Sequence, residues 1–328
     1  MSVRYTSATL RRELSLRGRE FACTQKLLHD LSPADDRILL FGRDPSGLHG
    51  NFHPASWKAI CANPAWARRL SKPHTAYRRS RALANWPWME LDSATSSDAL
   101  LMNILCHPEV FDGSTLTPQV AALLGVPLAA HPCFGVNPRI PLHPNPKGRT
   151  LTDRTEIDMR LADLFVEAKL TETGFQSARP ALIHRYRDLE AVFDVSRLPR
   201  TIPLELVPTD IYPDEEPTYD ESIPIPTPSL DTTPPRPATR PIAADKQPFQ
   251  GYQLIRNVLA AYASNASFCL LSDARRADLI DTWYAVLSAV HHPGFTWRLK
   301  LLTWQELDTA LPADLQLFLD AKYGITPA

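Results

Sequence analysis

Apolar and polar side chains alternate between Thr155 and Leu170, a pattern that predicts two consecutive β-strands. A two-residue turn at Ala162 and Asp163 would pair Leu161 with Leu164. One face of this hairpin is then wholly apolar and consists of Ile157, Met159, Leu161, Leu164, Val166, Ala168 and Leu170. The other face collects Glu156, Asp158, Arg160, Phe165, Glu167, Lys169 and Thr171.

Apolar residues at helical spacing predict helices over residues 97–106, 180–193, 252–263 and 278–290. A short apolar run predicts a buried strand over 267–271, and an alternating pattern predicts a strand over 296–302. A capping box at Thr303 and Glu306 predicts a final helix, interrupted at Pro312 and ending near Gly324. This order predicts a mixed α/β fold, in which a central mixed sheet is flanked by helices and preceded by a basic, helical N-terminal region.

A stretch rich in proline, residues 199–248, holds 13 prolines and an acidic run. Proline removes backbone donors and fixes φ, so this stretch is expected to be a largely disordered acidic insertion that tethers or binds a partner. It divides the chain into an N-terminal region at 1–95, a first part of the core at 96–198, the insertion, and a second part of the core at 249–328.

The composition, 44% apolar and 22% charged, is that of a soluble globular protein. No apolar run reaches the roughly 20 residues of a membrane helix, and arginines near the N-terminus exclude a secretory signal peptide, so a cytoplasmic protein is expected. The five cysteines form no CxxC pair, and the ten histidines form no HxxxH spacing within a predicted helix. A disulfide framework or a structural zinc site is therefore not expected, and the histidines are interpreted as structural.

Positive charge is concentrated before the proline-rich stretch. Residues 45–89 contain no Asp or Glu, while tryptophans and basic side chains interleave there. Such a surface suits a polyanion, because cations neutralise phosphates and aromatic rings stack on bases. The alternative is a solvated helix face with tryptophans in the core. The candidates for nucleic-acid contact in this segment are Arg68, Arg69, Lys72, Arg78, Arg79 and Arg81.

The polar face of the hairpin carries the candidate chemistry. In the predicted register Asp158 lies opposite Glu167, and directly opposed carboxylates destabilise a sheet unless a cation lies between them. Mg²⁺ binds through one or two carboxylates, waters and substrate phosphates. Lys169, on the same face, would position or deprotonate a water or stabilise the transition state, which suits phosphodiester hydrolysis. The alternative is an exposed face on which Lys169 neutralises its neighbours.

These strands, with a helix before them and a helix and strand after them, resemble the PD-(D/E)XK nuclease superfamily, and in particular a bacterial branch of restriction endonucleases. The resemblance covers about residues 95–328 without the proline-rich stretch. The segments that carry it are Val166-Glu167-Ala168-Lys169-Leu170-Thr171-Glu172, Tyr252-Gln253-Leu254-Ile255-Arg256-Asn257-Val258-Leu259, Thr303-Trp304-Gln305-Glu306-Leu307 and Lys322-Tyr323-Gly324-Ile325.

The resemblance implies that Asp158, Glu167 and the carbonyl of Ala168 bind Mg²⁺, or alternatively Mn²⁺, and that Lys169 is catalytic. It further implies that Gln253 faces the active site from the following helix. Arg256, three residues later, shares that helix face and is a further candidate for nucleic-acid contact.

One departure from the family concerns a third acidic residue, since residues 113–152 contain no Asp or Glu. The upstream candidates are Asp98 and Glu109.

The sequence thus predicts a metal-dependent DNA endonuclease, whether monomeric or homodimeric. Two alternatives stay open: a catalytically degenerate DNA-binding protein on the same fold, and an interaction scaffold that acts through the proline-rich segment. No GxSxG, GxGxxG or GxxxxGK[ST] motif occurs, so triad hydrolase, dinucleotide and NTPase functions are not expected.

Overall fold

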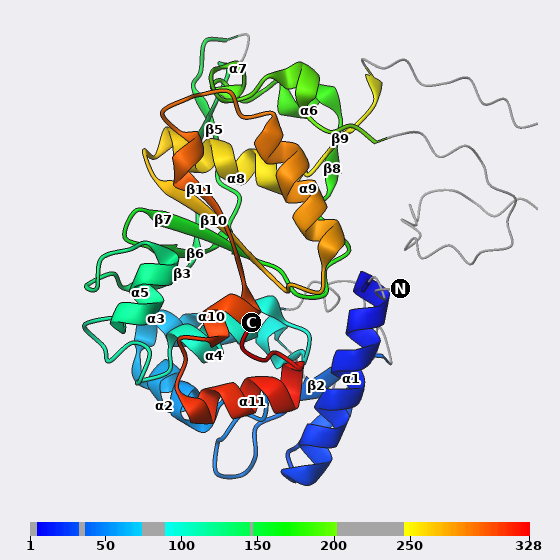
Figure 1. The fold of residues 1–328 in the computed structure, drawn as a ribbon, viewed down its shortest axis with the longest axis vertical. Helices are drawn as coiled ribbons and strands as arrows, with labels where there is room; N and C mark the ends of the chain where they lie inside the picture. The colour runs from blue at the N-terminus through cyan, green and yellow to red at the C-terminus, as the bar shows by residue number, and fades with distance from the viewer. Residues whose placement is uncertain (1–4, 33–36, 74–88, 145–146, 202–245) are drawn as a thin grey trace, which may run out of the picture.

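A five-stranded mixed sheet forms the centre of the protein in a computed structural model, which describes residues 5–32, 37–73, 89–144, 147–201 and 246–328 (Figure 1). The strands across the sheet are β11 (Leu299–Thr303), β10 (Ser267–Ser272), β7 (Leu164–Ala168), β6 (Ile157–Leu161) and β3 (Pro132–Val136). The first three run parallel, β6 pairs antiparallel with β7, and β3 pairs antiparallel with β6. The predicted mixed α/β class is confirmed.

The predicted hairpin is confirmed in its register from Met159 to Val166, and the predicted opposition of Asp158 to Glu167 lies beyond these paired residues. Leu161 pairs with Leu164, and Ala162 takes the left-handed backbone conformation (φ 51°) that a two-residue turn requires. Most of the predicted apolar face lies in one core cluster, but Ile157 packs in the cluster on the other side of the sheet. The pairing of β6 with β7 begins only at Met159. Ile157 therefore has no partner on β7 that would fix its side chain on the predicted face.

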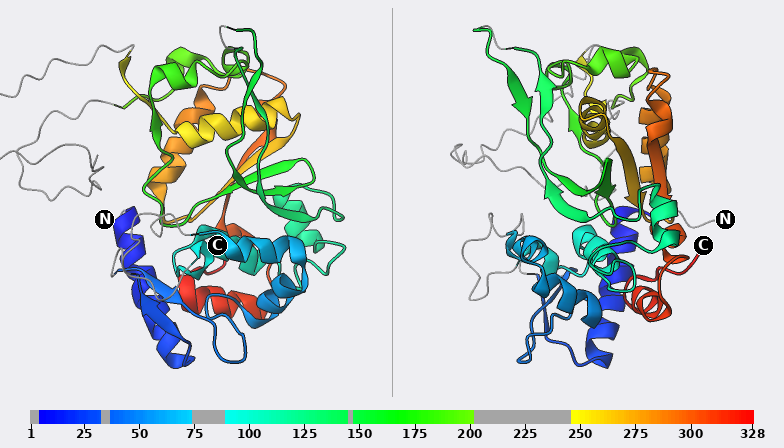
Figure 2. Two further views of the ribbon diagram at one scale, coloured as in Figure 1. Left: turned by 180° about the vertical axis from the view of Figure 1, so that it is seen from behind. Right: turned by 90° about the vertical axis from the view of Figure 1, so that its left-hand side faces the viewer.

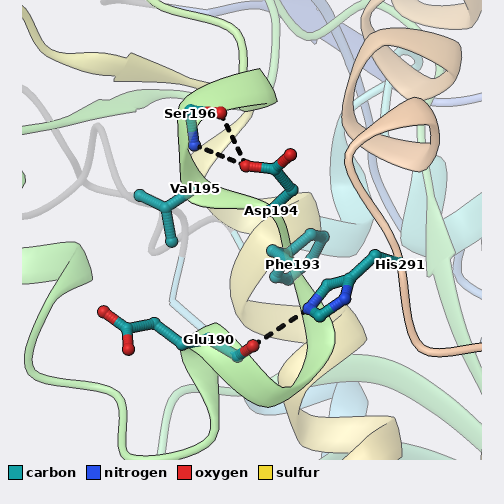
Figure 3. A pocket seen from close by; sticks show the side chains of 6 residues that line it. All are labelled: Glu190, Phe193, Asp194, Val195, Ser196 and His291. Atoms are coloured by element: carbon teal, nitrogen blue, oxygen red, sulfur yellow. Dashed lines mark hydrogen bonds between the residues drawn. The ribbon is translucent and has the colours of Figure 1, made fainter.

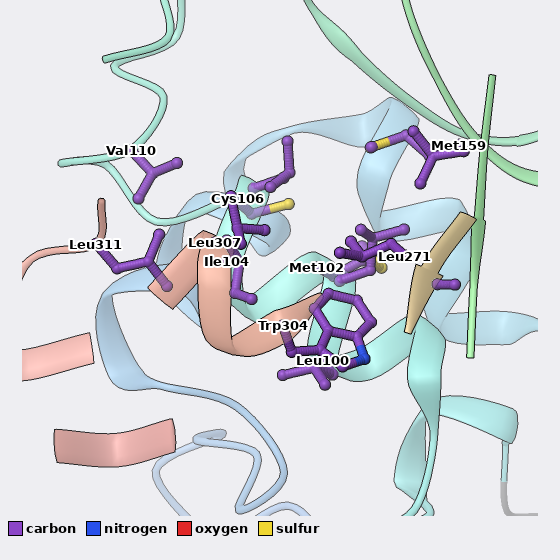
Figure 4. Packing of buried hydrophobic residues seen from close by; sticks show 14 of the residues in the cluster. Leu100, Met102, Ile104, Cys106, Val110, Met159, Leu271, Trp304, Leu307 and Leu311 are labelled. Atoms are coloured by element: carbon purple, nitrogen blue, oxygen red, sulfur yellow. The ribbon is translucent and has the colours of Figure 1, made fainter. Parts of the chain in front are cut away.

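Helices cover both faces of the sheet, with α8 (Tyr252–Ala263) and α9 (Ala277–Ser288) on one side and α4 (Ser97–Leu105), α10 (Trp304–Asp308) and α11 (Ala313–Tyr323) on the other (Figures 1 and 2). The apolar stripes predicted for these segments explain the two cores. Figure 4 shows the second of them, where Trp304 packs beside Leu100 of α4. No helix in the described part of the chain is long and apolar enough to cross a membrane.

The N-terminal region belongs to the same folded body as the sheet. Leu10 of α1, Trp57 of α2 and Trp66 of α3 are buried in the cluster that contains the sheet residues of the hairpin. These two tryptophans are therefore core residues, while Tyr77, Trp86 and Trp88 lie outside the described residues. The elements of this region are α1 (Ser7–Thr24), β1 (His29–Leu31), β2 (Leu39–Phe41), α2 (Pro54–Ala62), α3 (Pro64–Ala67), η1 (Arg68–Ser71) and η3 (Glu90–Asp92).

The helix predicted over residues 180–193 is wrong in its middle, because the segment forms two short helices, α6 (Pro180–Ile183) and α7 (Leu189–Val192). Between them the backbone pairs with another segment instead: the Arg185 carbonyl accepts from His143 N, and Arg187 N donates to Pro141 O. Tertiary hydrogen bonds thus replace the helical ones. The remaining short elements are α5 (Pro118–Leu124), β4 (Ile140–Leu142), β5 (Leu151–Asp153), β8 (Ser177–Ala178), η4 (Val195–Arg197) and β9 (Phe249–Gln250).

The C-terminal predictions are confirmed with one shift. Thr303 and Glu306 form the capping box, the chain re-enters a helix after Pro312, and Gly324 ends that helix in the left-handed conformation (φ 59°). The strand predicted from residue 296 begins at Leu299, since residues 296–298 form a 3-10 turn, η6 (Thr296–Arg298). Of the proline-rich stretch, residues 202–245 lie outside the described residues.

Candidate active site

Asp158 lies where the two strands of the hairpin stop pairing. Ladder pairing ends at Met159 and Val166, and the next polar contact across the strands is made by a side chain: Asp158 Oδ2 accepts a hydrogen bond from Ala168 N at 2.8 Å. The carboxylate thereby takes the place of a backbone acceptor. Asp158 is half-buried, so it has contact with both solvent and the end of β7.

Glu167 is buried, with 3% of its surface exposed. Both carboxylate oxygens are engaged: Lys169 Nζ lies 2.8 Å from Oε1, and Asn257 Nδ2 donates to Oε2 at 2.7 Å. A buried charge is tolerated only when paired and hydrogen-bonded, and here one cation and one amide from α8 meet that need.

Lys169 is fixed by its backbone as well as by its ammonium group. Its amide donates to Leu271 O of β10 at 2.8 Å, and its carbonyl accepts from Trp304 Nε1 at 2.9 Å. Arg276, fully buried, donates to Leu170 O and Glu172 O just downstream. The residues after β7 are therefore held by groups from β10, α10 and the loop before α9.

The electrostatics of the cluster are those of crowded carboxylates. Burial raises the pKa of Asp158 well above its usual value, and the charges of Glu167 and Asp98 raise it further. Burial alone would lower the pKa of Lys169, but the neighbouring carboxylates, Glu167 first among them, outweigh burial and raise it. The site therefore holds a lysine that stays protonated, beside carboxylates of which Asp158 takes up a proton more readily than a free aspartate does.

Asp98 is the upstream acid that the structure brings near this cluster. It is buried on α4, where Arg69 Nη2 lies 2.6 Å from its Oδ2. The same guanidinium contacts Glu156 Oε1 at 2.7 Å, and Lys72 Nζ lies 3.0 Å from that oxygen. Glu109, the other candidate, is exposed and follows His107 at the far end of α4.

Two cations predicted to contact nucleic acid are thus engaged with carboxylates of the protein. Arg69 is only 8% exposed and Lys72 is half-buried. Both cations contact the carboxylates of Asp98 and Glu156 and do not lie on an open surface. Arg68 is exposed on η1. The other candidates of this segment, Arg78, Arg79 and Arg81, lie outside the described residues.

On α8 the hydrogen bond to Glu167 comes from Asn257, while Gln253, the residue expected to face the site, is half-buried in the first turn of the helix. Asn257, one helical turn after Gln253, contacts Glu167, and it was missed in the sequence although the i, i+4 spacing was there to suggest it. Arg256 is buried and donates to Asn257 Oδ1 at 3.1 and 3.2 Å, so it acts on the site through Asn257.

Two hollows lie away from the cluster. One, of about 420 Å³, is lined by α7, the turn after it and His291, whose Nε2 is 3.0 Å from Glu190 O (Figure 3). The other, of about 760 Å³, is lined by Arg43, His49, Cys61 and neighbouring residues of the N-terminal region. Neither is lined by Asp158, Glu167 or Lys169.

Comparison with known proteins gives one family. The family model described as "Restriction Endonuclease associating with ARP" matches residues 32–324. Comparison with curated proteins and with solved structures gives no match.

Proposed function

Because the chain belongs to the family of restriction endonucleases associating with ARP, we propose that it hydrolyses phosphodiester bonds in DNA with the help of a divalent metal ion. The observation that carries the proposal is the meeting of Asp158, Glu167 and Lys169 at the end of two adjacent strands, with Lys169 Nζ 2.8 Å from Glu167 and Asp158 bonded to the backbone between them. The family match and this arrangement of two carboxylates and a lysine both support phosphodiester hydrolysis.

The residues present suit Mg²⁺ or Mn²⁺. Both ions take carboxylate and carbonyl oxygens, and a cation at Asp158 would offset the burial and the neighbouring carboxylate charges that raise the pKa of this residue. Asp158 and Glu167 would hold the ion, with the Ala168 carbonyl and Asp98 as further oxygen donors. When bound, the ion would activate water and offset charge on the scissile phosphate.

The side chains around the ion would stabilise charge, orient the ligands and admit the phosphate. Lys169, kept protonated by its acidic neighbours, would stabilise negative charge that develops on the phosphate. Asn257 would hold Glu167 in one orientation. Asp158 is partly exposed whereas Glu167 and Lys169 are buried, so the phosphate would approach from the side of Asp158.

One observation favours a second candidate, a DNA-binding protein that has lost catalysis. Both oxygens of Glu167 are already engaged, by Lys169 and Asn257, so an ion must compete with these partners. Cleavage of DNA by the unmodified protein decides between the two functions.

The experiment uses plasmid and linear DNA with Mg²⁺ or Mn²⁺. Glu167→Gln and Lys169→Met are expected to lose at least about 100-fold in cleavage rate, on the scale of removing one charge-stabilising group. Asp281→Asn, at an exposed position on α9, is the matched control and should cleave normally. DNA binding, measured by fluorescence anisotropy in EDTA, should persist in all variants. Binding without cleavage by the unmodified protein under either metal would establish the second candidate instead.

A further inference from the structure

Two histidines that are far apart in the sequence face each other in the fold. His53 precedes α2 and His107 follows α4, and their ring centroids are 4.9 Å apart. Each is followed by a proline, and each ring is oriented in the same way: His53 Nδ1 faces Ala55 N and His107 Nδ1 faces Glu109 N, both at 3.3 Å. The Nε2 atoms are therefore left to face something else.

What they face is Asp314, in the first turn of α11. Asp314 Oδ2 lies 3.7 Å from His53 Nε2 and 3.6 Å from His107 Nε2, while Oδ1 is held by Leu315 N at 2.9 Å. The three ligand atoms all lie within 4.8 Å of one another. The two distances from the carboxylate to the imidazoles, 3.6 and 3.7 Å, are too long for hydrogen bonds but close to the roughly 3.4 Å between ligand atoms around a tetrahedral ion with bonds of about 2.0–2.1 Å.

A second observation points to a ligand here. His107 is only 1% exposed, and its Nε2 is buried without a hydrogen-bond partner in the part of the chain that the structure describes. Buried polar atoms are nearly always satisfied, so this nitrogen requires a partner that the described side chains do not supply.

We propose that His53 Nε2, His107 Nε2 and Asp314 Oδ2 together bind one transition-metal cation of the Zn²⁺ type. Two imidazoles with one carboxylate suit Zn²⁺ and Co²⁺, whereas Mg²⁺ takes oxygen ligands only. Asp314 is the exposed member, with 55% of its side chain accessible, so the ion can enter from solvent and keep a water as its fourth ligand.

Metal binding has one local cost, which lies at the Nδ1 atoms. An imidazole that ligates through Nε2 carries its proton on Nδ1, where it would meet the backbone N–H of Ala55 or Glu109. Both contacts are long, at 3.3 Å, so each histidine gives up a weak hydrogen bond for a bond to the metal.

The ion would connect three segments that the sequence separates: the start of α2, the end of α4 and the start of α11. Its ligands are different from Asp158, Glu167 and Lys169, so this site is independent of the proposed nuclease site. Binding of the ion would stabilise the folded protein, because the three ligand atoms come together only in the folded arrangement.

The test is a titration of the full-length, metal-free protein with Co²⁺ and Zn²⁺ in the presence of excess Mg²⁺. The expected result is one equivalent of Co²⁺ with the visible absorption of a four-coordinate ion, displaced by Zn²⁺, and a higher melting temperature with Zn²⁺. Asp314→Asn, at an exposed position, and His53→Gln should each weaken binding at least about tenfold and remove the rise in melting temperature.

Glu109→Gln is the matched control, since Glu109 is an exposed acid beside His107 that contributes no ligand atom. It should bind the metal as the unmodified protein does. The proposal is overturned if Co²⁺ gives no saturable absorption, if Asp314→Asn and His53→Gln bind like the unmodified protein, or if Glu109→Gln weakens binding as much as Asp314→Asn. None of these readouts depends on DNA cleavage.

Discussion

Replacement of Asn257 by alanine should expose how strongly α8 supports the buried glutamate. The change removes the 2.7 Å hydrogen bond to Glu167 Oε2 and leaves that oxygen buried with no amide donor. A hydrogen bond to a charged group contributes about 1.5–3 kcal/mol, so the free energy of unfolding should fall by about 2 kcal/mol. For a protein of this size the melting temperature should then fall by about 4 °C.

A double-mutant cycle separates this bond from other effects of the substitution, such as the lost contact between Asn257 and Arg256. Urea unfolding in EDTA is measured for the unmodified protein, Asn257→Ala, Glu167→Met and the double variant, since methionine removes the oxygen that accepts from Asn257. We expect a coupling energy of at least about 1 kcal/mol between the two positions. A coupling energy near zero would refute the idea that Asn257 holds Glu167 in place.

Three further perturbations test other parts of the structure. Asp308 is buried, its carboxylate has no hydrogen-bond partner among the residues that the structure describes, and burial raises its pKa to about 6. Asp308→Asn should therefore raise the free energy of unfolding at pH 7 by up to about 3 kcal/mol. Because only the charged carboxylate is penalised by burial, this gain should shrink as the pH falls through 6 and vanish below about 4. A gain in urea unfolding that does not change with pH would contradict this reasoning. Thr303→Ala removes the capping box and should lower the free energy of unfolding by about 1 kcal/mol, and an unchanged melting curve would count against the box. Arg69→Met leaves the carboxylates of Asp98 and Glu156 without their shared guanidinium and should cost about 3 kcal/mol in urea unfolding, whereas a neutral effect would show that Lys72 alone suffices.

The hairpin was predictable because its information is local. Strict alternation and a turn too short for another register leave one pairing of Leu161 with Leu164, and that pairing brings Asp158 to the end of β7. The capping box was predictable for the same reason, because Thr303 and Glu306 are only three residues apart in the sequence. Where local chemistry decides the structure, the sequence is a sufficient guide.

The acidic partners of Arg69 and the contact of Asn257 with Glu167 depend instead on how distant segments of the chain pack together. A basic run shows that charge is present, but only the fold determines that Arg69 meets Asp98 from α4 and Glu156 from the segment before β6. Asn257 reaches Glu167 because α8 crosses the sheet at that point, which the helical pattern does not specify. The helix expected across residues 180–193 failed for the same reason, since its backbone finds partners near β4.

The guanidinium of Arg69 also determines how the polypeptide can be shortened. A fragment that starts at residue 96 would keep every candidate catalytic side chain, yet it would lack the cation that neutralises Asp98 and Glu156, and it would lack the tryptophans that fill the core beneath the hairpin. Such a fragment would carry uncompensated acids beside the candidate site. Trimming from the amino end is therefore a poor route to a smaller folded protein.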